Sequence, residues 1–255
     1  NSHGAAFANT AVLTSTPTTA TTGAVERARA SAQVTIVVPA PALAKNVSLT
    51  AATGPWSNAD TSANGGQTVY YRLTASNTSG RPPLHETVIV DCIDSRLTAF
   101  TNLTSPTVAT VSGPTAGDGL NGCALGRSKY TWTLTSDLGA TAAQIVYSAQ
   151  VPSPIPASST FRNDAALSGT TMPGVVDGER TLTATANRTV TAAVPIPTKT
   201  RLSPSGSAVP GETVTWRVTV PIPVGVNLYE ARILDTLPTQ LGTAAAATFT
   251  VSCGT

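Results

Sequence analysis

Charged side chains are scarce in this chain of 255 residues. Only 11% of its residues are charged, and its formal net charge is +2. Binding to nucleic acid requires a concentration of Lys and Arg that this composition does not supply, so we expect no nucleic-acid partner. The longest apolar runs fall well short of the roughly 20 residues that a membrane-spanning helix needs, so we expect no membrane span.

Residue types that carry catalysis or bind metals are also few. The two histidines, His3 and His85, are not in a zinc-binding spacing, and there is no G-x-S-x-G elbow or P-loop. The glycine-rich stretch 116–123 lacks the number of ligands that a calcium loop requires. We therefore expect no metal, no cofactor and no enzyme acting on an external substrate.

Cysteine is represented by only three residues, Cys92, Cys123 and Cys253. An odd number in a Thr-rich, Lys-poor chain suits an exported protein with one disulfide and one missing partner, although free thiols would also fit. We predict a Cys92–Cys123 disulfide, and the sequence leaves the pairing of Cys253 open.

Thr, Ala, Val, Ser, Gly and Pro dominate the composition, and 41% of the residues are hydrophobic, enough for a buried core. Short alternating segments are separated by Pro/Gly/Ser/Asn clusters, with no convincing helical periodicity. This pattern predicts an all-β protein built from immunoglobulin-like antiparallel β-sandwich repeats in tandem. The strands expected in the central part are 44–50, 67–76, 86–93, 107–112, 129–135, 143–150, 161–168 and 179–193.

Internal repetition gives the organisation of the chain. "GGQTVYYRLT" at 65–74 returns as "PGETVTWRVT" at 210–219, and "ETVIVDCIDSRL" at 86–97 returns as "EARILDTLPTQL" at 230–241. Three single residues recur as well: Asn9 as Asn163, Lys45 as Lys199, and Asp91 as Asp235.

These matches divide the chain into three parts. We assign 1–38 to the final strands of a preceding repeat, 39–194 to a complete β-sandwich repeat, and 195–255 to the opening strands of a following repeat. The chain is thus interpreted as a window on a longer array, or as a fragment whose ends are completed by neighbours.

Three polar residues lie on faces that are otherwise apolar. The period-two rule places Lys45 on one face with Leu43 and Val47, Asp91 with its flanking isoleucines, and Asn163 with the apolar residues of "FRNDAALSG". Burying an amine, an acid and an amide separately would be costly, whereas burying them together satisfies all three. Two of the only three lysines also occupy the same repeat position. We therefore expect the three side chains to meet in the core.

A lysine on the first strand, an aspartate late in a strand and an asparagine in F-x-N-x-A resemble the isopeptide-forming domains of Gram-positive pilins and surface adhesins. The order is also similar to that in related tandem repeats of large bacterial surface proteins. The resemblance covers the complete copy and both partial copies. It implies that a lysine amine attacks an asparagine side-chain carbonyl, that ammonia leaves, and that a buried acid shuttles protons.

In that reading Lys45 is the nucleophile, Asn163 the electrophile and Asp91 the proton shuttle. Desolvation lowers the pKa of a buried amine and raises that of a buried carboxyl, which makes a neutral amine beside a protonated acid accessible near neutral pH. Folding supplies the proximity that an inert amide needs. The equivalent residues are Lys199 and Asp235 in the following repeat and Asn9 in the preceding one, and we expect their partners outside residues 1–255.

Two alternatives remain open for this cluster. It could be an ordinary buried salt bridge between Lys45 and Asp91, with Asn163 adding hydrogen bonds. Asp94 is a second candidate for the acid, but the alignment of the repeats favours Asp91.

The functional expectation is a structural stalk repeat of a secreted bacterial cell-surface adhesin or pilus-like protein. One alternative is a self-assembling extracellular filament or sheath subunit completed by neighbouring chains. Another is an adhesin module whose loops 53–66 or 113–122 bind a host protein or glycan. The expected partners are therefore neighbouring repeats of the same polypeptide, identical subunits, or a host ligand.

Overall fold

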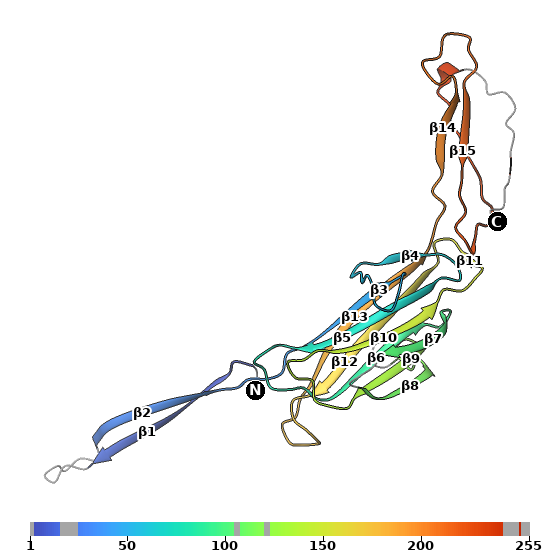
Figure 1. Cartoon of the computed structure of the whole chain (residues 1–255). Coiled ribbons are helices and arrows are strands. Elements are labelled where there is room, and N and C mark those ends of the chain that lie inside the picture. Colours follow the sequence, from blue (N-terminus) through green and yellow to red (C-terminus); the bar gives the residue numbers. More distant parts are fainter. Residues whose placement is uncertain (1–2, 16–24, 105–107, 120–122, 242–249, 251–255) are drawn as a thin grey trace.

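Strands dominate the computed structural model, and the one described helical segment is the short 3-10 helix η1 (Thr239–Leu241). Figure 1 shows a central β-sandwich with a β-hairpin projecting from each of its two ends. The prediction of an all-β, immunoglobulin-like antiparallel sandwich is confirmed. In the described part of the chain no helix has the length and apolar character needed to cross a membrane. The structure describes residues 3–15, 25–104, 108–119, 123–241 and 250.

One sheet of the sandwich contains four antiparallel strands in the order β3-β5-β10-β7. Along β5 the side chains alternate strictly between partly exposed and buried positions. This is the pattern of a sheet with one face in the core. The strands are β3 (Pro41–Ser48), β5 (Thr68–Asn77), β10 (Ala143–Gln150) and β7 (Thr98–Thr104).

The other sheet contains six strands in the order β4-β13-β12-β6-β9-β8. Neighbours are antiparallel except for the short edge strand β4, which runs parallel to β13. In the middle of the sheet, Ala165 of β12 lies opposite Asp91 of β6. The strands are β4 (Thr61–Ala63), β13 (Thr181–Ala192), β12 (Thr160–Thr170), β6 (His85–Asp94), β9 (Arg127–Leu134) and β8 (Val108–Ala116).

The core lies between the two sheets and takes inward-facing side chains from both. Trp132 of one sheet stacks on Tyr147 of the other, with their ring centroids 5.8 Å apart, and Tyr71 lies 5.2 Å from Tyr147. Each fully buried aromatic side chain removes roughly 150–250 Å² of surface from water. A few of them therefore supply much of the apolar burial in a chain that has few aromatic residues.

All eight strands expected in the central part are present, with ends that differ by a few residues. The strand β7 was not predicted, because its sequence "TAFTNLT" is polar and follows a turn. Phe100 is its one partly buried side chain, and it stacks on Tyr130 at a centroid distance of 3.7 Å. The contacts of this one aromatic ring, which also stacks on Tyr147 at 5.1 Å, and the backbone pairing with β10 therefore attach this edge strand, without a regular apolar pattern.

The two projecting hairpins are antiparallel. The first pairs β1 (Ala6–Ser15) with β2 (Val25–Thr35), and the second pairs β14 (Thr198–Ser203) with β15 (Thr215–Thr219). Every side chain of β1 is exposed, including Leu13 at 63%. The assignment of these hairpins to a preceding and a following repeat remains a prediction.

A short parallel pairing ties the C-terminal part of the chain to the sandwich. The strand β16 (Val226–Asn227) pairs with β11 (Ile155–Pro156), and Val226, only 6% exposed, joins the core. Glycine permits this close approach, because a Cβ on Gly65 would lie 2.1 Å from the carbonyl oxygen of Gly225. The second hairpin is thus attached both through the covalent chain and through β16.

The predicted disulfide between Cys92 of β6 and Cys123 is confirmed, with an S–S distance of 2.09 Å. It links β6 to the connection between β8 and β9. Cys253 lies outside the described residues.

Removing this disulfide should destabilise the sandwich. The two cysteines are 31 positions apart, and the loop-entropy model assigns such a cross-link about 3–4 kcal/mol. We expect the Cys92→Ala/Cys123→Ala variant to lose about that free energy of unfolding in urea denaturation. A Cys253→Ser background prevents thiol exchange. Reductant should weaken the parent by the same amount and leave the variant unchanged, and equal stability of parent and variant would contradict the estimate.

Candidate functional site

Lys45 lies on the inward face of β3, opposite Leu73 of β5. The same strand alternation that buries Val47 also buries Lys45, whose side chain has no exposed surface. A buried ammonium needs a partner of opposite charge or a hydrogen-bond acceptor. That partner is Asp91, whose Oδ1 accepts a hydrogen bond from Lys45 Nζ at 2.6 Å.

The register of β6 and β12 places Asn163 beside Asp91. Ala165 of β12 is directly opposite Asp91, and Asn163 lies two residues earlier on the same face. Diagonal neighbours of this kind are within reach of one another across a sheet. Both side chains are completely buried. The structure thus gathers Lys45, Asp91 and Asn163 into one cluster in the core.

Tyr147 of β10 connects the acid to the amide. Its hydroxyl donates to Asp91 Oδ2 at 2.5 Å and accepts a hydrogen bond from Asn163 Nδ2 at 2.6 Å. Among the described residues no direct hydrogen bond joins Asp91 to Asn163. A continuous buried chain of hydrogen bonds therefore runs from Lys45 through Asp91 and Tyr147 to Asn163.

Sequence reasoning missed Tyr147, because an inward-facing tyrosine looks like an ordinary core residue. Its alternation with Ile145 and Ala149 has the same appearance as that of any buried strand. The available signal was chemical: a buried phenol needs a hydrogen-bond partner, and Asp91 and Asn163 were predicted to lie in the same core.

Burial controls the protonation of this cluster. Desolvation lowers the pKa of Lys45 to about 8, and the nearby charge of Asp91 opposes part of that shift. Burial also raises the pKa of Tyr147 well above its ordinary value, with a further contribution from Asp91. A neutral amine at Lys45 is consequently accessible near physiological pH, while Tyr147 keeps its proton.

The amide of Asn163 is only half satisfied. Its Oδ1 atom is buried and accepts no hydrogen bond among the described residues, whereas its nitrogen donates to Tyr147. Native cores rarely leave a polar atom without a partner, and among the described residues the hydroxyl of Tyr71 and the indole nitrogen of Trp132 share this condition. The carbonyl of Asn163 is therefore the unsatisfied end of the hydrogen-bond chain.

Asp94, the alternative acid, lies at the end of β6 outside this cluster. Partial burial raises the pKa of Asp94, but hydrogen bonds from Arg96 outweigh that effect and lower it overall. The Arg96 guanidinium donates to both carboxylate oxygens, at 2.9 and 2.7 Å. Asp94 is thus engaged by arginine, and Asp91 is the acid that reaches Lys45.

The contact between lysine and aspartate recurs at the hairpin β14–β15. Lys199 Nζ lies 2.6 Å from Asp235 Oδ1 and 4.8 Å from the ring centroid of Trp216. In the sandwich, Lys45 Nζ lies 5.4 Å from the ring centroid of Tyr71. The strands β14 and β15 also pair in the register of β3 and β5. This second pair is 34% and 37% exposed, because no second sheet covers it in the described structure.

The strands β1 and β2 pair with each other in the same register as β12 and β13 do in the sandwich. Phe7 lies opposite Val34 in the first pair, as Phe161 lies opposite Val190 in the second. Asn9 consequently occupies the position that corresponds to the asparagine of the sandwich, but it is exposed. No described lysine is hydrogen-bonded to it.

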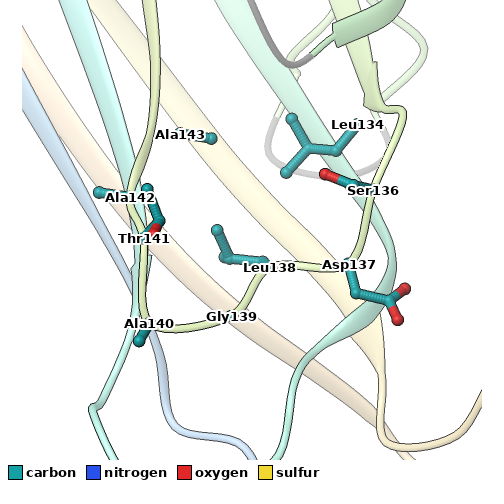
Figure 2. Close-up of a pocket in the computed structure, with 9 residues that line it drawn as sticks. All are labelled: Leu134, Ser136, Asp137, Leu138, Gly139, Ala140, Thr141, Ala142 and Ala143. Carbon is teal, nitrogen blue, oxygen red and sulfur yellow. The ribbon is translucent and has the colours of Figure 1, made fainter.

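A hollow of about 220 Å³ lies at the turn between β9 and β10 and is lined by residues of that turn (Figure 2). Most of the lining side chains are small. Its one carboxylate, Asp137, pairs with His85 at 2.8 Å. The lining thus offers little to recognise a ligand, and we assign no binding site to it.

Comparison with protein-family models finds no match, and comparison with curated protein sequences finds none either. Solved structures do resemble the chain. The full-length major pilin SpaD from Corynebacterium diphtheriae is 17% identical, and the similarity covers 62% of this chain and 35% of SpaD with a TM-score of 0.36. This chain therefore spans well under two thirds of that pilin.

Two further solved structures resemble the chain with similar sequence identity, coverage and TM-score. BcpA, the major pilin subunit of Bacillus cereus, is 13% identical, with 73% of this chain and 57% of BcpA covered and a TM-score of 0.39. The C-terminal domain of the AgI/II polypeptide BspA from Streptococcus agalactiae is 13% identical, with 73% and 63% covered and a TM-score of 0.36. At such identities the likeness concerns the fold alone, so the argument for function rests on the site.

Breaking the buried pair should be more damaging than replacing it. In an Asn163→Ala background, which removes the amide, either Lys45→Met or Asp91→Leu leaves one buried charge without its partner and should cost about 3–5 kcal/mol. The double variant restores a neutral, apolar pair and should lose much less than the sum of the single losses. Urea unfolding of the four proteins at pH 7 measures this double-mutant cycle. Strictly additive losses would mean that the two charges do not depend on each other.

Proposed function

We propose that this chain is a load-bearing part of a secreted, surface-attached bacterial protein, and that its sandwich is locked by an isopeptide bond between Lys45 and Asn163. The observation that carries the proposal is the buried hydrogen-bond chain from Lys45 through Asp91 and Tyr147 to Asn163. This hydrogen-bond chain ends at the buried amide of Asn163, whose carbonyl is the group that the lysine would attack.

The reaction exchanges one amide for another. Neutral Lys45 Nζ attacks Cγ of Asn163, a new C–N bond forms, the Cγ–Nδ2 bond breaks, and ammonia leaves. Burial makes the neutral amine accessible by lowering the pKa of Lys45 to about 8. The packed core holds both reactants in place, which converts a slow bimolecular reaction into an intramolecular step.

Protons can move along the hydrogen-bond chain during this step. Asp91 Oδ1 already accepts the hydrogen bond from Lys45 and can take the proton that the amine loses. Asp91 Oδ2 contacts the hydroxyl of Tyr147, which contacts the nitrogen that must leave. Once that nitrogen gains a lone pair in the tetrahedral intermediate, the hydroxyl can donate to it and receive a proton from Asp91. Tyr147 thus completes the relay.

The position of the bond gives it a mechanical consequence. It joins β3, the first strand of the sandwich, to β12, near the end of the sandwich. A pulling force that enters at β3 would pass through the bond to β12 and bypass residues 46–162. The bond forms once per molecule, so this chemistry is maturation rather than turnover and uses no cofactor. The Cys92–Cys123 disulfide fits the oxidising, extracellular setting of such a protein.

Intact mass spectrometry tests the bond. The reduced protein should be lighter than its sequence by one ammonia molecule, and peptide mapping should find a branched Lys45–Asn163 peptide. The Lys45→Ala and Asp91→Asn variants should have their full mass, whereas Tyr147→Phe should form the bond roughly 10²-fold more slowly because the relay is interrupted. Lys129→Ala is the matched control, since Lys129 pairs with Asp118 near the surface. A full-mass parent would refute the bond.

The rate of bond formation after refolding should fall above about pH 8. In the reactive form the amine of Lys45 is neutral and the titratable proton lies on Asp91, so the pair holds the same number of protons as the ion pair does. Below the Lys45 pKa of about 8 the pair keeps this proton, so the rate should not change with pH through neutral pH. Above pH 8 the Lys45–Asp91 pair loses this proton, and the rate should fall about tenfold per pH unit. A time course of mass loss from pH 6.5 to 10 provides the measurement, and a rate that rises through pH 8 would exclude a required acid.

A further inference from the structure

The hydroxyl of Tyr71 takes no part in the hydrogen-bond chain of the core. Tyr71 lies on the inward face of β5, between the strand of Lys45 and the strand of Tyr147. The residue is fully buried, and its hydroxyl forms no hydrogen bond within the described part of the chain. A buried hydroxyl without a partner destabilises a fold, so its presence points to a role other than stability.

The register of the four-stranded sheet brings this hydroxyl to Asn163. Tyr71 is directly opposite Tyr147, and the two rings are stacked with an angle of 22° between their planes. Opposite residues on neighbouring strands point to the same side of a sheet, so the two phenols extend side by side toward the other sheet. The hydroxyl of Tyr147 contacts the amide of Asn163. The hydroxyl of Tyr71 is therefore carried toward the same amide.

The protonation of Tyr71 agrees with this placement. Desolvation raises the pKa of Tyr71, the charge of Asp91 raises it further, and the amide of Asn163 partly opposes both effects. Tyr71 consequently keeps its proton at the pH values at which the amine of Lys45 becomes neutral. It is available there as a hydrogen-bond donor.

The matching acceptor is Oδ1 of Asn163, which is also buried and without a hydrogen bond among the described residues. This oxygen gains negative charge when an amine adds to Cγ. A donor that is already in place where charge develops lowers the barrier of acyl transfer. Contacts of this kind are often long before the reaction and shorten as the charge forms.

Trp132 and Arg188 also have a buried nitrogen without a partner. Trp132 lies on β9, which is separated from β12 by β6. Arg188 is opposite Asn163 on β13, but its guanidinium donates to the backbone carbonyl of Asn187 at the surface. Tyr71 is thus the donor that the geometry favours.

We propose that the hydroxyl of Tyr71 is the oxyanion donor of the isopeptide reaction, an inference that rests on the proposed function. Lys45 Nζ adds to Cγ of Asn163, the electron pair of the carbonyl moves to Oδ1, and Tyr71 donates a hydrogen bond to that oxygen without losing its proton. When the pair returns to form the new carbonyl, the Cγ–Nδ2 bond breaks and ammonia leaves with the proton relayed by Tyr147.

The two stacked tyrosines then have different tasks. Tyr147 moves a proton to the leaving nitrogen, whereas Tyr71 stabilises the charge on the oxygen. In the product the carbonyl of the new amide accepts the hydrogen bond from Tyr71, so that both unpaired atoms gain a partner.

The internal repetition of the sequence keeps a donor at this position. In the aligned segments 65–74 and 210–219, Tyr71 corresponds to Trp216. The indole N–H of tryptophan is, like the hydroxyl of tyrosine, a donor at the edge of a large apolar ring. Phenylalanine would provide the ring without the donor.

The Tyr71→Phe variant removes only the hydroxyl and tests the proposal. In a time course of mass loss after refolding, it should form the Lys45–Asn163 bond about 10²-fold more slowly than the parent. Tyr70→Phe is the matched control, because Tyr70 is the adjacent residue on the outward face of β5, and it should react at the parent rate. A Tyr71→Phe rate equal to that of the parent would overturn the proposal. Slowing in Arg188→Met or Trp132→Phe but not in Tyr71→Phe would overturn it as well.

Stability measurements distinguish this role from a packing role. A Lys45→Met/Asp91→Asn background cannot react and has no buried charge pair, but it retains Tyr71 and Asn163. Adding Tyr71→Phe to it should leave the urea midpoint unchanged or raise it, because the hydroxyl has no partner before the reaction. A lower midpoint would show that the hydroxyl supports the unreacted fold and would contradict the proposal.

The parent protein separates this proposal from the proposed function. If the parent loses one ammonia and Tyr71→Phe does so equally fast, the role of Tyr71 is refuted while the locked sandwich stands. If the parent keeps its full mass, the bond itself is refuted, and the role of Tyr71 with it.

Discussion

A lysine ammonium that has no contact with water must be neutralised by its neighbours, and the centre of this sandwich is arranged around that requirement. Removing an ammonium and a carboxylate from water costs several kcal/mol for each ion, and their attraction offsets that cost only if the remaining polar atoms are also satisfied. Here Asp91 has one oxygen on Lys45 and the other on Tyr147, which in turn holds the nitrogen of Asn163. Four strands from both sheets must therefore keep their register for the pair to exist. The cluster makes a slip of one residue in any of these strands costly, because the slip would turn a polar group out of the network.

An isopeptide bond would relieve the same constraint. The reaction replaces an ammonium by a neutral amide, so that no buried positive charge remains to be compensated. The new amide N–H can then donate to Asp91, and the acid no longer needs to be ionised. The desolvation that destabilises the unreacted pair thus favours the products over the reactants, while the lowered pKa of Lys45 makes the reactive amine accessible. One physical cause, burial, acts on both the rate and the equilibrium.

Strand alternation was sufficient to predict the sandwich strands and to place Lys45, Asp91 and Asn163 on inward faces, because polar residues at core positions break an otherwise apolar pattern. It could not predict Tyr147, because a tyrosine continues that pattern and its hydroxyl has meaning only once its neighbours across the sheets are known. It also missed β7, whose attachment depends on pairing with β10 and on the ring contacts of Phe100 with Tyr130 and Tyr147. The pairing of β16 with β11 was inaccessible for a different reason, since it depends on two glycines far apart in the sequence whose backbones touch. The features that could not be predicted from the sequence are thus contacts between elements that are far apart in the chain, whereas the local strand pattern could be predicted.

The load path follows from combining these contacts. In the proposed locked sandwich the extensible part under tension is reduced to the β12–β13 hairpin, because the bond bypasses the strands between β3 and β12. At the exit from that hairpin, β13 leads into β14, while β16 returns to pair with β11 and inserts Val226 into the core. The second hairpin is therefore held at two points, and bending at the junction requires removing Val226 from the core and breaking the hydrogen bonds of β16. A single flexible linker would impose neither cost. If the proposed bond forms, resistance to stretching within the sandwich would thus be continued by resistance to bending at its end, the combination that the proposed stalk role would require.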